Sequence, residues 1–129
     1  MATLDDVADL AADLPETTET DRHGTRTWGV GGKTFAWERP FSKADIKRFG
    51  AAPIPGYPIV AIRVADQTDK EAVLAQGHSG VFTIEHFNGY NAVLIELDKV
   101  EAGVLAELVE DGWLALAPPK VVDDWRASR

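Results

Sequence analysis

Two glycine-bearing dipeptides constrain the fold of this chain most, because each lies between two segments in which apolar and polar side chains alternate. Gly31-Gly32 separates residues 26–30 from residues 33–39, and Asn88-Gly89 separates residues 81–87 from residues 90–97. Both dipeptides suit the positive φ angles of a two-residue β-turn, so each predicts a hairpin of antiparallel strands. The chain is therefore expected to contain a largely antiparallel sheet.

The pairing within each hairpin predicts which side chains share a face of the sheet. The register of the first hairpin sets Trp28 opposite Phe35. It also sets Arg26 opposite Trp37. Because side chains alternate along a strand, each hairpin should then present one apolar face. These faces are expected to carry Trp28, Val30, Phe35 and Trp37 in the first hairpin, and Phe82, Ile84, Val93 and Ile95 in the second.

Helical segments flank the strands. Thr3 with Asp6, and Ser42 with Asp45, have the spacing of capping boxes at helix N-termini. Further helices are expected after Thr68 and after Asp98, one more turn over residues 121–125, and two further strands over residues 17–22 and 59–64. The order α-β-β-β-α-β-α-β-β-α predicts an α+β fold, a single domain over residues 1–129. Its expected core includes Leu4, Val7, Leu14, Trp28, Phe35, Ile62, Phe82, Ile84, Val93, Ile95, Leu105 and Leu108.

Composition excludes several classes of protein. The 129 residues include no cysteine, which rules out a disulfide framework, a thiolate metal site and a cysteine nucleophile. The apolar stretch of residues 57–62 is too short to cross a bilayer. The first residues carry no basic start and no apolar segment of the kind that marks a secretory signal. We expect a cytoplasmic monomer without membrane contact.

The motifs that suggest catalysis are incomplete. Residues 29–34 read GVGGKT, but a phosphate-binding P-loop needs a glycine where Thr27 stands and a helix after the lysine. His86 neighbours Glu85, yet adjacent residues of a strand point to opposite faces. No converging acid, base and nucleophile can be placed. We therefore expect no enzymatic activity, no catalytic residue, no metal site and no cofactor, nucleotides included.

Charge is distributed unevenly along this acidic chain, whose formal net charge is −8. Between residues 22 and 48 there are seven Lys and Arg against Glu38 and Asp45, a local excess of five positive charges. These bases either pair with the acidic helices around them or form a patch that binds anions. If the patch binds DNA, the binding should be weak and without sequence preference. The candidate contact residues are Arg26, Lys33, Arg39, Lys43, Lys47 and Arg48.

Aromatic side chains alternate with these bases on the first hairpin. Such a pattern is typical of platforms for single-stranded nucleic acid, in which bases stack on rings and cations meet phosphates. The same rings also suit the apolar face that a half-buried hairpin needs, and that interpretation is favoured here.

The ordered set of segments resembles the MmcQ/YjbR family over nearly the whole chain. The resemblance rests on Leu14-Pro15, His23-Gly24, residues 28–36, 59–64 and 86–95, Trp113-Leu114-Ala115 and Pro118-Pro119-Lys120. It implies a CyaY-like, "double wing" domain, with helices packed on a curved antiparallel sheet, and DNA as the partner. The leading hypothesis is a non-enzymatic DNA-binding module. The alternative is an acidic protein-interaction or regulatory domain that binds a protein partner and no nucleic acid.

Overall fold

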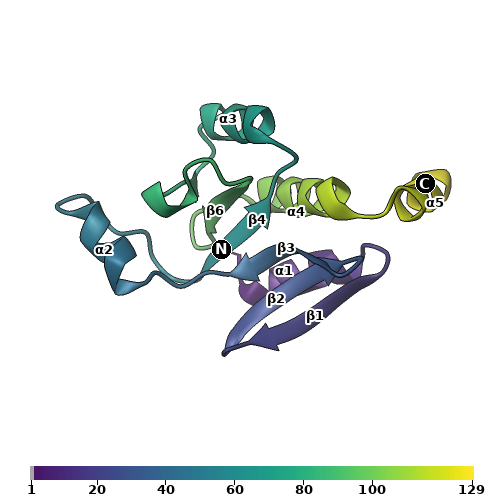
Figure 1. The fold of residues 1–129 in the computed structure, drawn as a ribbon, viewed down its shortest axis with the longest axis horizontal. Helices are drawn as coiled ribbons and strands as arrows, with labels where there is room; N and C mark the ends of the chain where they lie inside the picture. The colour runs from purple at the N-terminus through teal and green to yellow at the C-terminus, as the bar shows by residue number, and fades with distance from the viewer. Residues whose placement is uncertain (1) are drawn as a thin grey trace.

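A computed structural model describes residues 2–129 as one α+β domain built on a curved six-stranded sheet (Figure 1). All neighbouring strands are antiparallel and follow the order β1-β2-β3-β4-β6-β5. The predicted fold class is confirmed. The strands are β1 (Thr17–Arg22), β2 (Thr25–Val30), β3 (Lys33–Glu38), β4 (Ile59–Arg63), β5 (Val81–Phe82) and β6 (Ala92–Glu96).

Local sequence signals define most helix ends. Both expected capping boxes are present, at Thr3 and at Ser42. Asp66 caps the third helix in place of Thr68, and the single turn expected near the C-terminus is a nine-residue helix that begins at Pro119. The helices are α1 (Leu4–Ala12), α2 (Lys43–Phe49), α3 (Gln67–Ala75), α4 (Ala102–Leu116) and α5 (Pro119–Ala127), with a 3₁₀ turn η1 (Glu85–Phe87). Among residues 2–129, no helix combines the length and the hydrophobicity that crossing a membrane requires.

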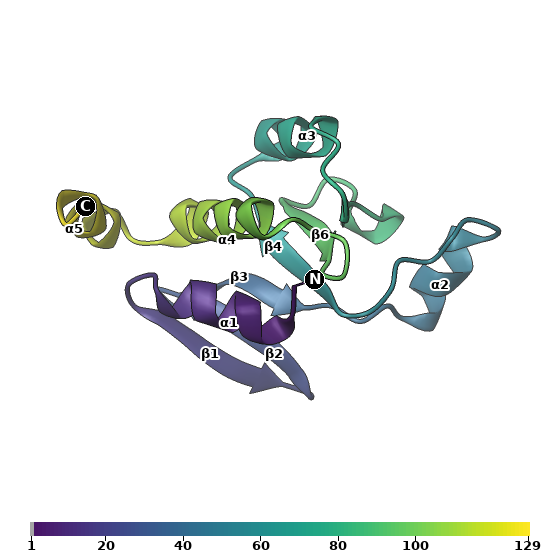
Figure 2. The same cartoon turned by 180° about the vertical axis from the view of Figure 1, so that it is seen from behind.

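The main core lies between one face of the sheet and helices α1 and α4 (Figure 2). The fully buried rings of Trp28, Phe35 and Trp113 fill its centre. The indole of Trp113 also donates a hydrogen bond to the carbonyl of Pro15, 3.1 Å away, which joins α4 to the end of α1. Nine of the twelve expected core residues are buried, and Leu4, Phe82 and Ile84 are half-buried.

A β-bulge corrects the register predicted for the first hairpin. Val30 pairs with Lys33 as expected, but Trp28 pairs with Ala36 and Thr27 pairs with Trp37. Phe35 is the extra residue, so Phe35 and Ala36 both lie on the core side and the alternation reverses beyond them. Trp37 therefore projects from the opposite face to Trp28, and Arg26 does not face it. Gly29 permits this geometry, since a Cβ there would lie 2.9 Å from the carbonyl oxygen of Lys33.

The second predicted hairpin is also different. Strands β5 and β6 pair, but Asn88-Gly89 does not join them as a two-residue turn, because residues 83–91 form a loop that contains η1. Phe82 pairs with Leu94, so Phe82 and Ile84 pack with Ala92 and Leu94 in a second apolar cluster, while Ile95 faces the main core. His86 lies in η1 and does not face Asn91 across two strands.

Candidate binding site on the open face of the sheet

Strands β1–β3 have one face that no described helix covers, which we call the open face (Figure 1). The register places Thr27 beside Thr20 on one side and beside Trp37 on the other. These positions alternate with core positions on the same strands and so face away from the core. Threonine suits them because it is polar and favours strands. The open face carries Thr18, Thr20, Arg22, Thr25, Thr27, Gly29, Thr34 and Trp37.

Three aromatic rings gather where the open face meets the loop of residues 83–91. The Trp37 ring centroid lies 6.4 Å from that of Phe87 and 6.2 Å from that of Tyr90. Phe87 and Tyr90 make an edge contact at 5.4 Å. Phe87 is buried, whereas Tyr90 keeps 41% of its surface exposed. The group therefore presents the Tyr90 ring and part of the half-buried Trp37 ring to solvent.

Two adjoining hollows of about 460 and 420 Å³ share Trp37 and Tyr90. The first is lined also by Arg22, His23 and three threonines, and the second also by Arg39, His86 and Phe87. Among residues 2–129, no carboxylate lines either hollow, although the chain has 21 Asp and Glu. The surface offers rings for stacking, cations for phosphate and hydroxyls for hydrogen bonds.

The turn between β1 and β2 places His23 at the rim of the first hollow. His23 has φ 53° and Gly24 has φ 84°, both in the left-handed region. Asp21 accepts a hydrogen bond from the amide of Gly24 at 2.9 Å, and the Thr25 hydroxyl donates to the carbonyl of Arg22 at 2.6 Å. These two contacts stabilise the turn and hold Arg22 and His23 next to the threonines.

A buried lysine holds the loop that carries Phe87 and Tyr90. The Nζ of Lys70, on α3, donates to the carbonyl of Phe87 at 2.6 Å and to that of Tyr90 at 2.9 Å. Burial lowers the pKa of the Lys70 ammonium. The loop is thus attached to α3 across the end of the sheet.

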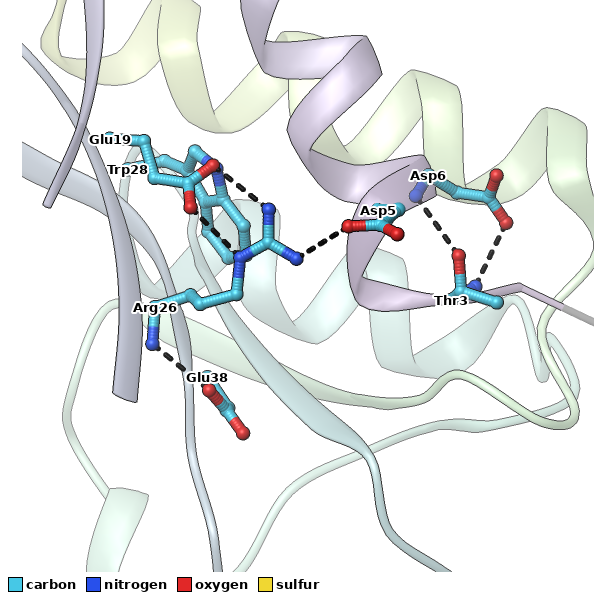
Figure 3. Close-up of polar contacts among 7 residues, drawn as sticks. All are labelled: Thr3, Asp5, Asp6, Glu19, Arg26, Trp28 and Glu38. Carbon is cyan, nitrogen blue, oxygen red and sulfur yellow. Dashed lines mark hydrogen bonds and ion pairs between the residues drawn. The ribbon is translucent and has the colours of Figure 1, made fainter. Parts of the chain in front are cut away.

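The candidate contact Arg26 lies on the helix side of the sheet (Figure 3). Its guanidinium bonds Glu19 at 2.8 Å and Asp5 of α1 at 2.8 Å, and lies 5.5 Å from the Trp28 ring centroid. Hydrogen bonding to Glu19 and Asp5 raises the pKa of Arg26, and the same contact lowers the pKa of Glu19. Glu19 also accepts from the Trp28 indole at 2.9 Å. Arg26 therefore joins α1 to the sheet.

The remaining candidate contacts divide into two groups. Arg39 and Arg48 reach the buried carboxylate of Asp45 at 3.0 and 3.7 Å, and Arg39 also lies 5.6 Å from the Phe87 ring centroid in the second hollow. Lys33, Lys43 and Lys47 are exposed and form no ion pair within residues 2–129. The six bases do not form one stripe, because Arg26 and Arg39 lie on opposite faces. Their role as nucleic-acid contacts stays a prediction.

Several residues of the open face were missed by sequence reasoning. The sequence predicts Tyr90 in a strand, includes Arg22 in the basic segment 22–48 but not among the six candidate contacts, and indicates no binding role for His23. The only local signal for the positions of Arg22 and His23 is the pair His23-Gly24, which suits a tight turn. Within residues 2–129, no group of three or more His, Asp or Glu side chains has a geometry that could hold a metal ion.

The fold and this face define a class of protein: a small α+β domain with helices on one side of a curved sheet and an open, aromatic and basic patch on the other. The chain belongs to the YjbR family, whose model matches residues 12–115.

Relatives and a solved structure agree with this membership. The uncharacterized proteins Rv2570 of Mycobacterium tuberculosis and Mb2600 of Mycobacterium bovis are each 42% identical over 131 residues, covering 99% of this chain and 98% of their own. A crystal structure of Deinococcus radiodurans protein DR2400, which carries domain DUF419, superposes with a TM-score of 0.58. It is 24% identical and covers 88% of this chain and 78% of its own, so it supports the fold alone.

Proposed function

We propose that this chain is a non-enzymatic binding module that holds single-stranded DNA on the open face of its sheet. The observation that carries the proposal is the pair of hollows around Trp37 and Tyr90, which contain cations and hydroxyls but no carboxylate in a chain of net charge −8. Proteins that bind single strands combine stacking rings with a positively charged groove.

Each group on the face has a place in this interaction. The exposed ring of Tyr90 and the half-buried ring of Trp37 offer stacking surfaces for bases. Arg22 lies at one end of the paired hollows and Arg39 at the other, so a backbone crossing both hollows would meet a guanidinium at each end. Arg39 is already paired with Asp45. Arg22 is therefore expected to be the stronger phosphate contact.

The acidic remainder of the chain limits the affinity. Its net charge repels phosphate at long range, so dissociation constants should lie toward the weak end of the range of about 10⁻⁴ to 10⁻⁶ M that is usual for non-specific binding. We expect little sequence preference, because stacking and phosphate contacts do not read base edges.

The test is fluorescence anisotropy with labelled single-stranded and duplex DNA at low and moderate salt. Tyr90→Ala should weaken single-strand binding by roughly 5- to 150-fold, the equivalent of about 1–3 kcal/mol of base stacking. Arg22→Ala should weaken it and reduce the salt dependence. The matched controls are Tyr57→Ala, an exposed tyrosine 54% accessible and outside both hollows, and Arg126→Ala on α5.

The outcomes separate the alternatives. Binding that is lost in a Lys43→Glu, Lys47→Glu variant but unchanged in Tyr90→Ala and Arg22→Ala would place the contact on the α2 lysines. No binding to either form of DNA at low salt would overturn the proposal and favour a domain that binds only protein.

A further inference from the structure

Helix α2 carries an exposed apolar side chain beside two lysines that form no ion pair within residues 2–129. Ile46 is 45% exposed, and Lys43 and Lys47 lie three residues before and one residue after it. At about 100° per residue, the three side chains lie within an arc of about 100°, with Lys43 and Lys47 one turn apart and Ile46 at the edge of the arc. Ile54 and Tyr57, in the segment that follows, are 47% and 54% exposed. Three of the four exposed large hydrophobic residues thus belong to this protruding part of the chain (Figure 1).

A groove between α3 and α4 has the complementary arrangement. Its volume is about 370 Å³, and its apolar lining comes from Val73 on α3 and from Leu108 and Leu114 on α4. Asp69 lines it from α3 and Asp111 from α4. Burial, together with the nearby Glu107, Glu110 and Asp69, raises the pKa of Asp111, as expected when carboxylates crowd without cations. The groove thus combines an apolar lining with two acids, as the α2 face combines an apolar side chain with two bases.

One cation, Arg63, also lines the groove but is directed elsewhere. Its guanidinium lies 5.4 Å from the Tyr90 ring centroid, and its Nη1 is 3.4 Å from the Tyr90 hydroxyl. Among the described ion pairs, neither Asp69 nor Asp111 has a basic partner. The acidic side of the groove is therefore available to a cation from outside the domain.

We infer that the α3–α4 groove binds the Lys43–Ile46–Lys47 face of α2 from a second copy of this chain. Within one copy, α2 and α4 extend to opposite sides of strands β4 and β6 in both views, so the contact forms between molecules (Figures 1 and 2). Ile46 enters the apolar centre, and the two ammonium groups meet Asp69 and Asp111. Each copy offers both surfaces, so the interface is heterologous and joins copies head to tail.

The association is weak. Ion pairs at an exposed interface contribute modestly, and two copies of net charge −8 repel each other at long range. We expect reversible self-association that grows between micromolar and millimolar protein. Charge complementarity at such a contact chiefly selects the partner surface and the orientation.

The experiment is sedimentation equilibrium of the full chain without nucleic acid. A Lys43→Glu, Lys47→Glu variant should lower the association constant at least about tenfold, because like charges then face each other. A Lys33→Glu, Lys120→Glu variant has the same net charge but alters lysines outside both surfaces, and it should associate as the unmodified chain does. Circular dichroism of every variant establishes that it is folded.

A charge exchange tests the pairing directly. An Asp69→Lys, Asp111→Lys variant should also fail to associate with itself, because its groove is then basic. Mixing it with the Lys43→Glu, Lys47→Glu variant should restore association, since each groove then meets an α2 of opposite charge. A chain that stays monomeric at millimolar concentration, or two α2 and groove variants that do not recover on mixing, would overturn the inference. The proposed DNA contact at Tyr90 and Arg22 is independent of every one of these outcomes.

Discussion

Single buried or half-buried polar residues connect parts of this chain that are distant in sequence. Lys70 joins α3 to the loop of residues 83–91, Arg26 joins α1 to the sheet, and Asp45 joins α2 to the end of β3 through Arg39. Charged groups in such positions are stable because each has hydrogen-bonding partners that replace water. Their removal should therefore cost more than the loss of an exposed ion pair.

Lys70→Met tests the lysine that holds the loop. Methionine keeps an unbranched apolar stem but leaves the carbonyls of Phe87 and Tyr90 without their donor. We expect the free energy of unfolding to fall by about 1–3 kcal/mol, and DNA binding to weaken because Tyr90 loses its support. Urea denaturation and anisotropy measure the two effects. Lys120→Met, whose side chain is 86% exposed, should change stability by less than about 0.5 kcal/mol. Equal effects in both variants would contradict this role for Lys70.

Asp45 should make the free energy of unfolding depend on pH in the acidic range. Burial disfavours its charged form, but the amide and hydroxyl of Ser42 and the guanidinium of Arg39 outweigh that effect and lower its pKa below the usual 3.8. The ionised carboxylate therefore stabilises the folded state above about pH 4, and this contribution is lost as the pH falls through the lowered pKa.

Asp45→Asn should reduce the free energy of unfolding by about 1–3 kcal/mol at pH 7, and by less at pH 3. Urea titrations at both pH values measure the difference. Asp124→Asn is the control, because the Asp124 side chain is 69% exposed. A cost that is the same at both pH values would show that the ionised form of Asp45 contributes nothing.

At the level of elements, close approach of α4 to the sheet depends on Gly112. A Cβ at this position would lie 2.8 Å from the Cγ2 of Ile62 and 3.2 Å from the carbonyl oxygen of Arg63, both on β4. Gly103, in the first turns of the same helix, has open space around it. Alanine substitutions at these two glycines therefore distinguish the effect of helix propensity from the effect of core packing within one helix.

Gly112→Ala should destabilise the protein by about 1–3 kcal/mol, because the added methyl group overpacks the core. Gly103→Ala should stabilise it by about 0.5–1 kcal/mol, because alanine is the better helix former. Thermal and urea unfolding of the two variants measure these opposite signs. Stabilisation by both substitutions would mean that α4 does not lie this close to β4.

The β2–β3 hairpin should not bind nucleotide phosphates. Gly31 and Gly32 have φ angles of 59° and 77° in a tight turn, and Lys33 begins a strand, so no helix N-terminus follows the glycines. We expect no hydrolysis of Mg²⁺-ATP or Mg²⁺-GTP and no change in nucleotide affinity on Lys33→Ala. Calorimetry and phosphate release measure both. Saturable binding that disappears in the variant would contradict this expectation.

For the whole molecule, the distribution of charge matters more than its total. The hollows of the open face lack carboxylates, the α3–α4 groove has two and the α2 face has two cations. Net charge alone argues against an anionic ligand, yet local surfaces of either sign form because acids and bases are separated in space. The bases of residues 22–48 do not form one continuous stripe, since Arg26 lies on the helix side of the sheet, and Arg26, Arg39 and Arg48 have acidic partners.

The sequence alone determined most element types, the two capping boxes, the antiparallel class and most of the main core. These depend on local spacing, and Thr3, Ser42 and Gly31-Gly32 behave as their local signals predict. Only the tertiary structure decided which face each strand residue occupies and where the loops lie. One bulge at Phe35 reverses the side of Trp37, and the contacts of Lys70 hold residues 83–91 in a loop where Asn88-Gly89 favours a hairpin. The candidate site could not be predicted because it depends on the bulge and on the loop. One inserted residue reverses the face of every later side chain in its strand, and long-range hydrogen bonds can outweigh the local preference for a turn.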